Sequence, residues 1–221
     1  NSQMPSRLSE PNICRKSINS DRHMKKTIII ICSILCFNIA NAQDWAKFSR
    51  YENANAEVTT TPKAVFMGDS ITDGWAAQDQ DFFTSNNFLG RGISGQTTSH
   101  MLVRFRRDVI DHNPKYVVIL AGTNDIAKNN GEISLENIVG NIVSMCELAK
   151  ANKIKPVICS VLPADRYGWR PGMTPAQDIV KLNEMLKEYA ASAHIKYVDY
   201  HSVLKDENNG LPAKHAKDGV H

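Results

Sequence analysis

The chain has 221 residues, of which 42% are apolar and 22% are charged, a balance typical of a globular protein with a buried core. Its formal net charge is +3, but the first 42 residues hold six Lys and Arg against two acidic residues, a net of +4, so the remainder carries −1. The folded part therefore has no basic surplus for nucleic acid, and we expect no nucleic-acid partner.

The N-terminal region has the pattern of an export signal. From Met24 the sequence reads "MKKTIIIICSILCFNIANAQ", in which two lysines lead into an apolar run and then Ala40-Asn41-Ala42. The run is shorter than the roughly 20 apolar residues that a membrane span needs. We therefore expect a signal peptide at 24–42, an upstream segment without structural role at 1–23, and an exported domain at 43–221, periplasmic or extracellular, with no membrane insertion after cleavage.

Five apolar runs in the expected domain predict buried strands, at 64–68, 88–92, 116–122, 156–163 and 196–200. Between them, apolar residues recur at helical spacing over 102–109, 135–149 and 179–193. "TPAQ" at 174–177 predicts a capping box that starts the last of these helices, with Thr174 as N-cap. This alternation is typical of parallel βαβ units, so we expect a three-layer α/β/α domain with a five-stranded parallel sheet.

Only Cys146 and Cys159 fall in this domain. Two cysteines make no disulfide framework and have no metal-ligand spacing, so we expect small buried side chains and no metal or other cofactor.

Small polar residues follow three of the strands, in "GDSITDG", "GRGISGQTT" and "GTNDIAK", and "KDGVH" closes the chain. The carboxyl ends of parallel strands share one edge of the sheet, where open α/β sheets bind ligands. Acyl transfer needs a nucleophile, a base, a group that holds the base and donors for an oxyanion. Ser70, His221, Asp218, Gly95 and Asn124 supply all four.

The order G-D-S, S-G-x-T, G-x-N-D and D-x-x-H resembles the GDSL/SGNH hydrolase superfamily over residues 64–221. "MGDSITDGW" with "LAGTNDI" is most similar to the acetylhydrolase-type branch, related to platelet-activating-factor acetylhydrolases and bacterial carbohydrate acetylesterases. The resemblance implies a flavodoxin-like SGNH fold and a cofactor-free serine esterase. Its substrates would be short-chain, above all acetyl, esters of carbohydrates or small molecules.

The same resemblance assigns roles to individual residues. Ser70 would be the nucleophile, His221 the general base, and Asp218 the carboxylate that holds the imidazole ring. The Ser70 and Gly95 N–H groups and the Asn124 amide would form the oxyanion hole. The family continues past the histidine with a proline and a final helix, so this chain is expected to be a C-terminally truncated domain that lacks that helix and exposes an apolar patch.

Other interpretations remain open from the residues alone. Ser70 can be a helix cap, Asp69 and Asp125 are expected to fix loop geometry, and His215 is an alternative base. "GRGISG", Gly90–Gly95, matches the G-x-G-x-x-G pattern of a nucleotide- or flavin-binding module, although no strong strand precedes it and no helix starts directly after it. A non-catalytic sugar-binding relative is a third possibility.

Substrate contacts are expected from Trp75 and from the loop "PADRYGWRPGMT" at 163–174. In that loop, Tyr167 and Trp169 are candidates to stack on a sugar ring, and Arg166 and Arg170 to meet an acidic group. The alternative is a rigid solvent-facing loop fixed by its prolines. The oligomeric state is left open.

Overall fold

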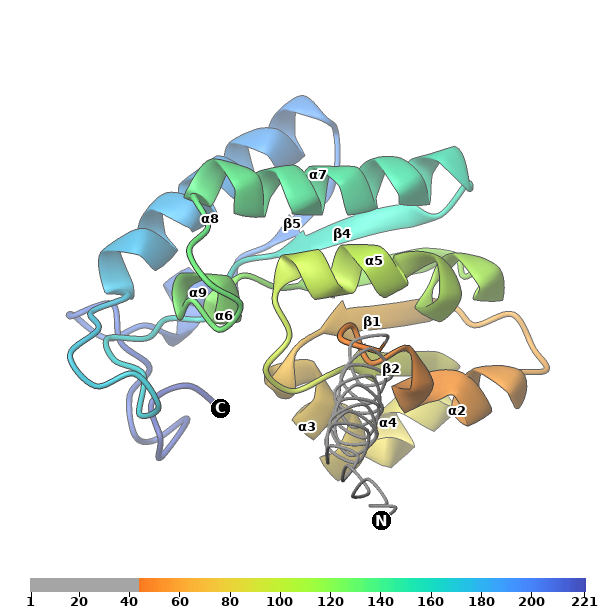
Figure 1. Ribbon diagram of the computed structural model, residues 1–221, viewed down its shortest axis with the longest axis horizontal. Coiled ribbons are helices and arrows are strands. Elements are labelled where there is room, and N and C mark those ends of the chain that lie inside the picture. Colours follow the sequence, from red (N-terminus) through yellow and green to blue (C-terminus); the bar gives the residue numbers. More distant parts are fainter. Residues whose placement is uncertain (1–43) are drawn as a thin grey trace, which may run out of the picture. The chain divides into compact units, whose positions relative to one another are not determined.

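The computed structural model describes residues 44–221 (Figure 1). The predicted signal peptide and the upstream segment lie outside these residues. Within the described residues, five strands form one sheet, namely β1 (Ala64–Gly68), β2 (Phe88–Gly92), β3 (Tyr116–Leu120), β4 (Lys155–Cys159) and β5 (Lys196–Val198). All pairings are parallel and the order is β2-β1-β3-β4-β5. The predicted five-stranded α/β fold is confirmed.

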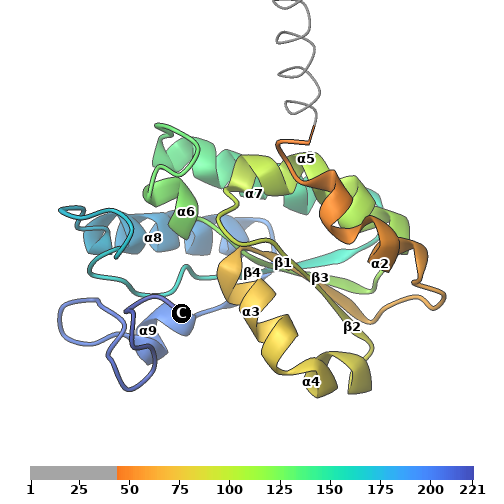
Figure 2. The ribbon, with the colours of Figure 1, turned by 60° about the horizontal axis from the view of Figure 1, so that its bottom comes forward.

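Helices cover both faces of the sheet (Figure 2). One face carries α5 (Thr98–Asp108), α7 (Leu135–Ala151) and α8 (Ala176–Ser192), and the other carries α3 (Ser70–Gln78), α4 (Gln80–Ser85) and α9 (Tyr200–Leu204). The remaining elements are η1 (Phe48–Tyr51), α2 (Glu52–Ala56), η2 (Ile110–His112) and the single turn α6 (Thr123–Ile126). None of the helices within residues 44–221 has the length and apolar content to cross a bilayer.

The core lies between the sheet and the α5, α7 and α8 layer. Side chains alternate along β3, where Val117 and Ile119 are buried on this face. The predicted apolar stripes of α7 and α8 meet them, with Ile142 and Leu182 fully buried. On the opposite face an apolar hollow of about 480 Å³ remains, lined among others by Phe66, Trp75, Phe82, Val118, Val157 and Val198.

Three predicted strands end earlier than expected, at Leu120, Cys159 and Val198, and the residues after the first and the third of them lead into the helices α6 and α9. Gly122 takes φ +128° ahead of α6, and Asp199 caps α9 by accepting from the Ser202 N–H. The predicted capping box at 174–177 is wrong, since α8 starts after Pro175 without any side-chain cap. Cys146 and Cys159 are buried free thiols, and burial raises the pKa of each to about 12.

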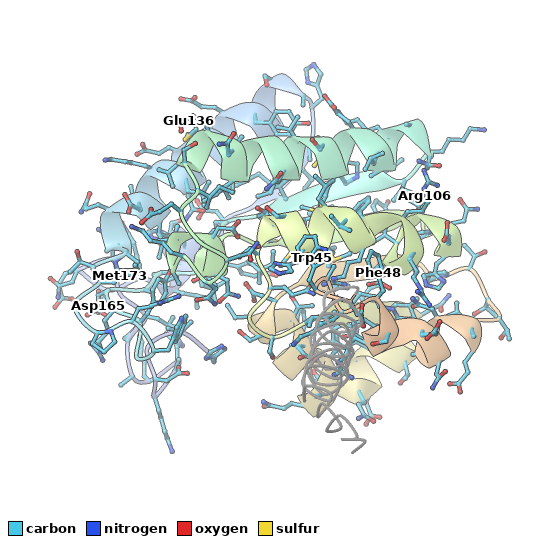
Figure 3. The ribbon with its side chains drawn as sticks, viewed as in Figure 1. Trp45, Phe48, Arg106, Glu136, Asp165 and Met173 are labelled. Carbon is cyan, nitrogen blue, oxygen red and sulfur yellow. The ribbon has the colours of Figure 1, made fainter. Side chains whose placement is uncertain are left out.

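The order in which strands are added to the sheet reverses at β1, since β2 lies on one side of β1 and β3 on the other. This switch point leaves a crevice beyond the carboxyl ends of the two central strands, where open α/β sheets place their ligands. The loop between β4 and α8 reaches the same end of the molecule, as Asp165 and Met173 show in Figure 3. Arg106, near the end of α5, lies at the opposite end (Figure 3).

Candidate active site

The first loop of the site is a sharp strand-to-helix turn. Gly68 ends β1 at a point where a Cβ would lie 2.1 Å from Thr72 Oγ1 and 2.9 Å from the Leu120 carbonyl oxygen, so no other residue fits. Asp69 then caps α3, its carboxylate accepting from the Ile71 N–H at 3.0 Å. Ser70 therefore stands at the first position of the helix, beyond the edge of the sheet.

Ser70 is joined to the end of the chain by two short hydrogen bonds. Its Oγ lies 2.7 Å from His221 Nε2, and His221 Nδ1 lies 2.6 Å from Asp218 Oδ2. Gly219, at φ +77°, forms the turn that lets Asp218 and His221 face one another. Such a serine–imidazole–carboxylate chain can take a proton from the hydroxyl and stabilise the imidazolium that results.

The other Asp218 oxygen, Oδ1, accepts from the Val220 N–H at 3.0 Å and from the His221 N–H at 2.9 Å. Partial burial opposes ionisation of Asp218, but these hydrogen bonds and the one from the His221 ring lower its pKa to about 2. Asp218 is therefore an ionised carboxylate at neutral pH and can accept a hydrogen bond from the His221 ring.

Two further groups lie at the same pocket, which measures about 450 Å³ and is lined by Ser70, Ser94, Gly95, Asn124, Asn129, Trp169 and His221. Gly95 takes φ +81° in the second loop, a conformation that leaves no side chain between its backbone and the pocket. Asn124, in α6, is 3% exposed and its amide donates to the Gln96 carbonyl oxygen at 3.0 Å.

Asp125 fixes the second and third loops to one another, as the sequence analysis expects. Its carboxylate accepts from the Thr98 N–H at 2.9 Å and from the Thr98 hydroxyl at 2.6 Å, so α6 is tied to the start of α5. Burial raises the pKa of Asp125 to about 6, although both Thr98 donors oppose the shift. Burial likewise raises the pKa of Asp69 to about 6, against the Ile71 N–H.

The glycine run Gly90–Gly95 does not form a nucleotide-binding turn. Gly90 and Gly92 lie inside β2, where a Cβ would come within 2.3 Å of Ala76 Cβ and of the Asp73 nitrogen, respectively. Both glycines therefore let α3 pack closely on the strand. The following helix, α5, starts only at Thr98.

The structure separates the candidate substrate residues. Trp169 lies at the pocket, 6.5 Å from the His221 ring between centroids, and is 42% exposed. Tyr167 is 1% exposed, stacks beneath Trp169 and has its hydroxyl 2.9 Å from Thr123 Oγ1, so it has no face for a sugar. Trp75 packs against Phe82 in an aromatic cluster on the other side of α3, away from the pocket.

The two arginines of the loop are also engaged. Arg166 pairs with its neighbour Asp165 at 3.1 Å, and Arg170 donates to the Lys128 carbonyl oxygen at 3.1 Å. His215 is not among the residues that line the pocket. Within residues 44–221, no three His, Cys, Asp or Glu side chains are grouped so as to hold a metal ion.

A set of supporting residues lies behind the pocket and was not predicted from the sequence. Arg104, fully buried in α5, donates to the Gly68 carbonyl oxygen, to Gln96 Oε1 and to Asp108, and so connects the first two loops. An arginine four residues before an aspartate in an otherwise apolar stripe was the available signal. Asn129 gave no such signal, since "KNNG" is typical of any exposed turn.

Comparisons with known proteins define the class. Residues 66–221 match the GDSL-like Lipase/Acylhydrolase family, and the chain belongs to that family. A Bacteroides fragilis structure is 49% identical with a TM-score of 0.79, over 81% of this chain and 89% of that one. A GDSL-like lipase from Bacteroides thetaiotaomicron is 46% identical with a TM-score of 0.77, over 80% and 89%.

Among curated proteins, the platelet-activating factor acetylhydrolase IB subunit alpha1 of Rattus norvegicus is 30% identical over 48% of this chain. The uncharacterized lipoprotein YqeF of Bacillus subtilis is 36% identical over 35% of this chain. The chain spans 46% and 33% of the lengths of these two relatives. The predicted relation to acetylhydrolase-type members of the family is confirmed.

Proposed function

We propose that this protein is an exported serine esterase that hydrolyses short-chain, chiefly acetyl, esters of carbohydrates or small molecules. The observation that carries the proposal is the continuous hydrogen-bonded chain from Ser70 through His221 to Asp218 at the edge of the pocket. In this mechanism Ser70 Oγ attacks the ester carbonyl carbon while His221 Nε2 takes the hydroxyl proton. The ring then returns that proton to the departing alcohol, and water resolves the acyl-enzyme by the same steps.

The negative charge of the tetrahedral intermediate falls on the former carbonyl oxygen. The N–H groups of Ser70 and Gly95 and the amide of Asn124 are the donors proposed to receive it. Of the residues that the structure describes, those that line the pocket include no aliphatic side chain against which a long acyl chain could pack, which favours a short acyl group. The half-exposed Trp169 ring beside His221 offers a flat face of the kind that packs against a sugar leaving group.

Export rests on the signal pattern at 24–42, and the relative YqeF is named a lipoprotein. N-terminal sequencing of the protein recovered from the cell envelope or medium would test it. A new N-terminus at Gln43 is expected, and an intact Met24 segment would contradict export by cleavage.

The catalytic part is tested by hydrolysis of an aryl acetate and of an acetylated sugar by the full chain, with Ser70→Ala as the control. Turnover should be lost in Ser70→Ala and should decrease from acetate to longer acyl esters. Equal turnover in both proteins would overturn the serine mechanism. A folded protein that binds the acetylated sugar without hydrolysing it would favour the sugar-binding alternative.

A further inference from the structure

Asn129 joins the loop between β4 and α8 to the proposed oxyanion donor. The Trp169 indole N–H donates to Asn129 Oδ1 at 3.2 Å, and Asn129 Nδ2 donates to Asn124 Oδ1 at 2.7 Å. Asn124 Nδ2 in turn donates to the Gln96 carbonyl oxygen at 3.0 Å. Three side chains from two loops thus form one directed chain of hydrogen bonds.

The direction of this chain is set by the indole N–H at one end and by the Gln96 carbonyl oxygen at the other. An indole N–H can only donate, so Asn129 must present its carbonyl oxygen to Trp169 and its amide nitrogen to Asn124. Asn124 must then present its own carbonyl oxygen to Asn129. Its NH₂ group is left to face Gln96 and the pocket that Asn124 lines. The opposite orientation would place the Asn124 carbonyl against the Gln96 carbonyl, and against the negative charge of an oxyanion.

The backbone holds Asn129 where it can do this. Its N–H donates to the Asn124 carbonyl oxygen at 3.0 Å, and left-handed residues lie on either side of it, Lys128 at φ +57° and Gly131 at φ +89°. Arg170, next to Trp169, donates to the Lys128 carbonyl oxygen at 3.1 Å. The turn after α6 is therefore fixed to the same loop that carries Trp169.

We propose that Asn129 is a positioning residue that sets the orientation of the Asn124 amide and couples it to Trp169. Trp169, which is proposed to pack against the leaving alcohol, would then also help to orient the oxyanion donor Asn124. This inference rests on the proposed esterase function. Asn129 acts only through Asn124, and that dependence distinguishes it from a residue that merely supports the fold.

The test compares Asn129→Asp with Asn130→Asp in the full chain. Aspartate keeps the shape and the acceptor for Trp169 but has no N–H for Asn124, and Asn130 is an exposed neighbour that receives the same charge change. For Asn129→Asp, kcat on an aryl acetate should fall about 10- to 100-fold, less than the about 100- to 1,000-fold loss for removal of one oxyanion donor, while KM stays near the wild-type value. Asn130→Asp should keep the wild-type kcat.

A double-mutant cycle decides whether the effect passes through Asn124. In the Asn124→Ala background, Asn129→Asp should cause no further loss of kcat, because no amide remains to be oriented. Trp169→Phe keeps a ring to stack on Tyr167 but loses the indole N–H, so it should lower kcat in the same sense and by less. Concentrations are those of active protein, counted by phosphonylation of Ser70, so that an unfolded fraction does not imitate the effect.

Equal kcat in Asn129→Asp and Asn130→Asp would overturn the inference, and so would losses that multiply in the double variant. Both results leave the esterase proposal standing as long as Ser70→Ala is inactive. Turnover by Ser70→Ala at the wild-type rate would overturn the esterase proposal and this inference together.

Discussion

The two sides of the pocket are built in opposite ways. On the side of the proposed oxyanion donor Asn124, the donor side, Asn124 and Asp125 are 3% and 1% exposed and are hydrogen-bonded to Gln96, between β2 and α5, and to Thr98, at the start of α5. On the side of the proposed general base His221, the base side, the Asp218 and His221 side chains are 55% and 40% exposed and are held mainly by one tight turn. The proposed mechanism accounts for this difference, because oxyanion donors must be in place before charge develops, whereas a general base needs only a local frame that leaves its ring accessible.

The carboxylates of the two sides show the same contrast. Burial raises the pKa values of Asp69 and Asp125 to about 6, whereas hydrogen bonds outweigh partial burial and lower that of Asp218 to about 2. Ionisation of Asp69 or Asp125 therefore lowers the free energy of unfolding, whereas the folded state favours ionisation of Asp218. Changes on the base side should affect catalysis alone, and changes on the donor side should affect both catalysis and stability.

The largest effect should follow Asp218→Asn. The amide cannot hold the imidazolium or enforce the ring tautomer, so kcat on an aryl acetate should fall about 10³- to 10⁴-fold. Because the pair is exposed, urea denaturation should show a change in the free energy of unfolding below about 1 kcal/mol. Asp165→Asn, a control on the nearby loop, should keep the wild-type kcat. A large loss of stability in Asp218→Asn would remove the contrast between the two sides.

Asn124→Ala should have the next largest effect and should differ in kind. Loss of one oxyanion donor lowers kcat by about 100- to 1,000-fold. The Gln96 carbonyl oxygen and the Asn129 amide would also lose their partner, which should cost about 1–3 kcal/mol of unfolding free energy. Kinetics and urea denaturation on one preparation measure both. Unchanged stability would mean that the donor side is no more tightly built than the base side.

The sequence predicted those parts of the candidate site that depend on neighbouring strands or on residues close together in the chain. Ser70 and Asn124 follow strands β1 and β3, which are neighbours in the sheet, so parallel geometry alone brings them together. Asp218 and His221 are three residues apart and meet through a single turn. The motifs and the strand pattern were therefore sufficient to predict that these four residues lie at the same end of the sheet, while their catalytic roles stay a prediction.

Trp75 and Tyr167 were misplaced and Asn129 was not predicted, and each has its own physical reason. Trp75 follows Ser70 by five residues in α3, which rotates its side chain about 140° around the helix from the serine. Tyr167 is buried because Thr123, far away in sequence, accommodates its hydroxyl. Asn129 reaches Asn124 only through the left-handed turn at Lys128, which polar residues in an exposed segment do not specify.

The last prediction concerns stability rather than kcat, and isolates the buried Asp69 carboxylate by the pH dependence of the free energy of unfolding. Asp69 has a pKa of about 6 in the fold against 3.8 in its ordinary state, so the folded chain binds the proton more tightly than the unfolded chain. Its contribution to stability is therefore complete below pH 3.8 and is lost as the pH rises through 6, by about 3 kcal/mol for a shift of this size.

Asp69→Asn keeps an oxygen that can accept from the Ile71 N–H but cannot ionise. Urea denaturation at pH 4, 5, 6 and 7 should therefore show a shallower fall of unfolding free energy with pH than in the wild-type chain, with Asp125 responsible for the remaining slope. Asp218→Asn is the opposite control, because the Asp218 contribution is present above pH 3.8 and is lost only as the pH falls toward 2. If the free energy of unfolding falls equally with pH in the wild-type chain and in Asp69→Asn, Asp69 stays ionised in the fold. Burial would then not raise its pKa above the ordinary value of 3.8.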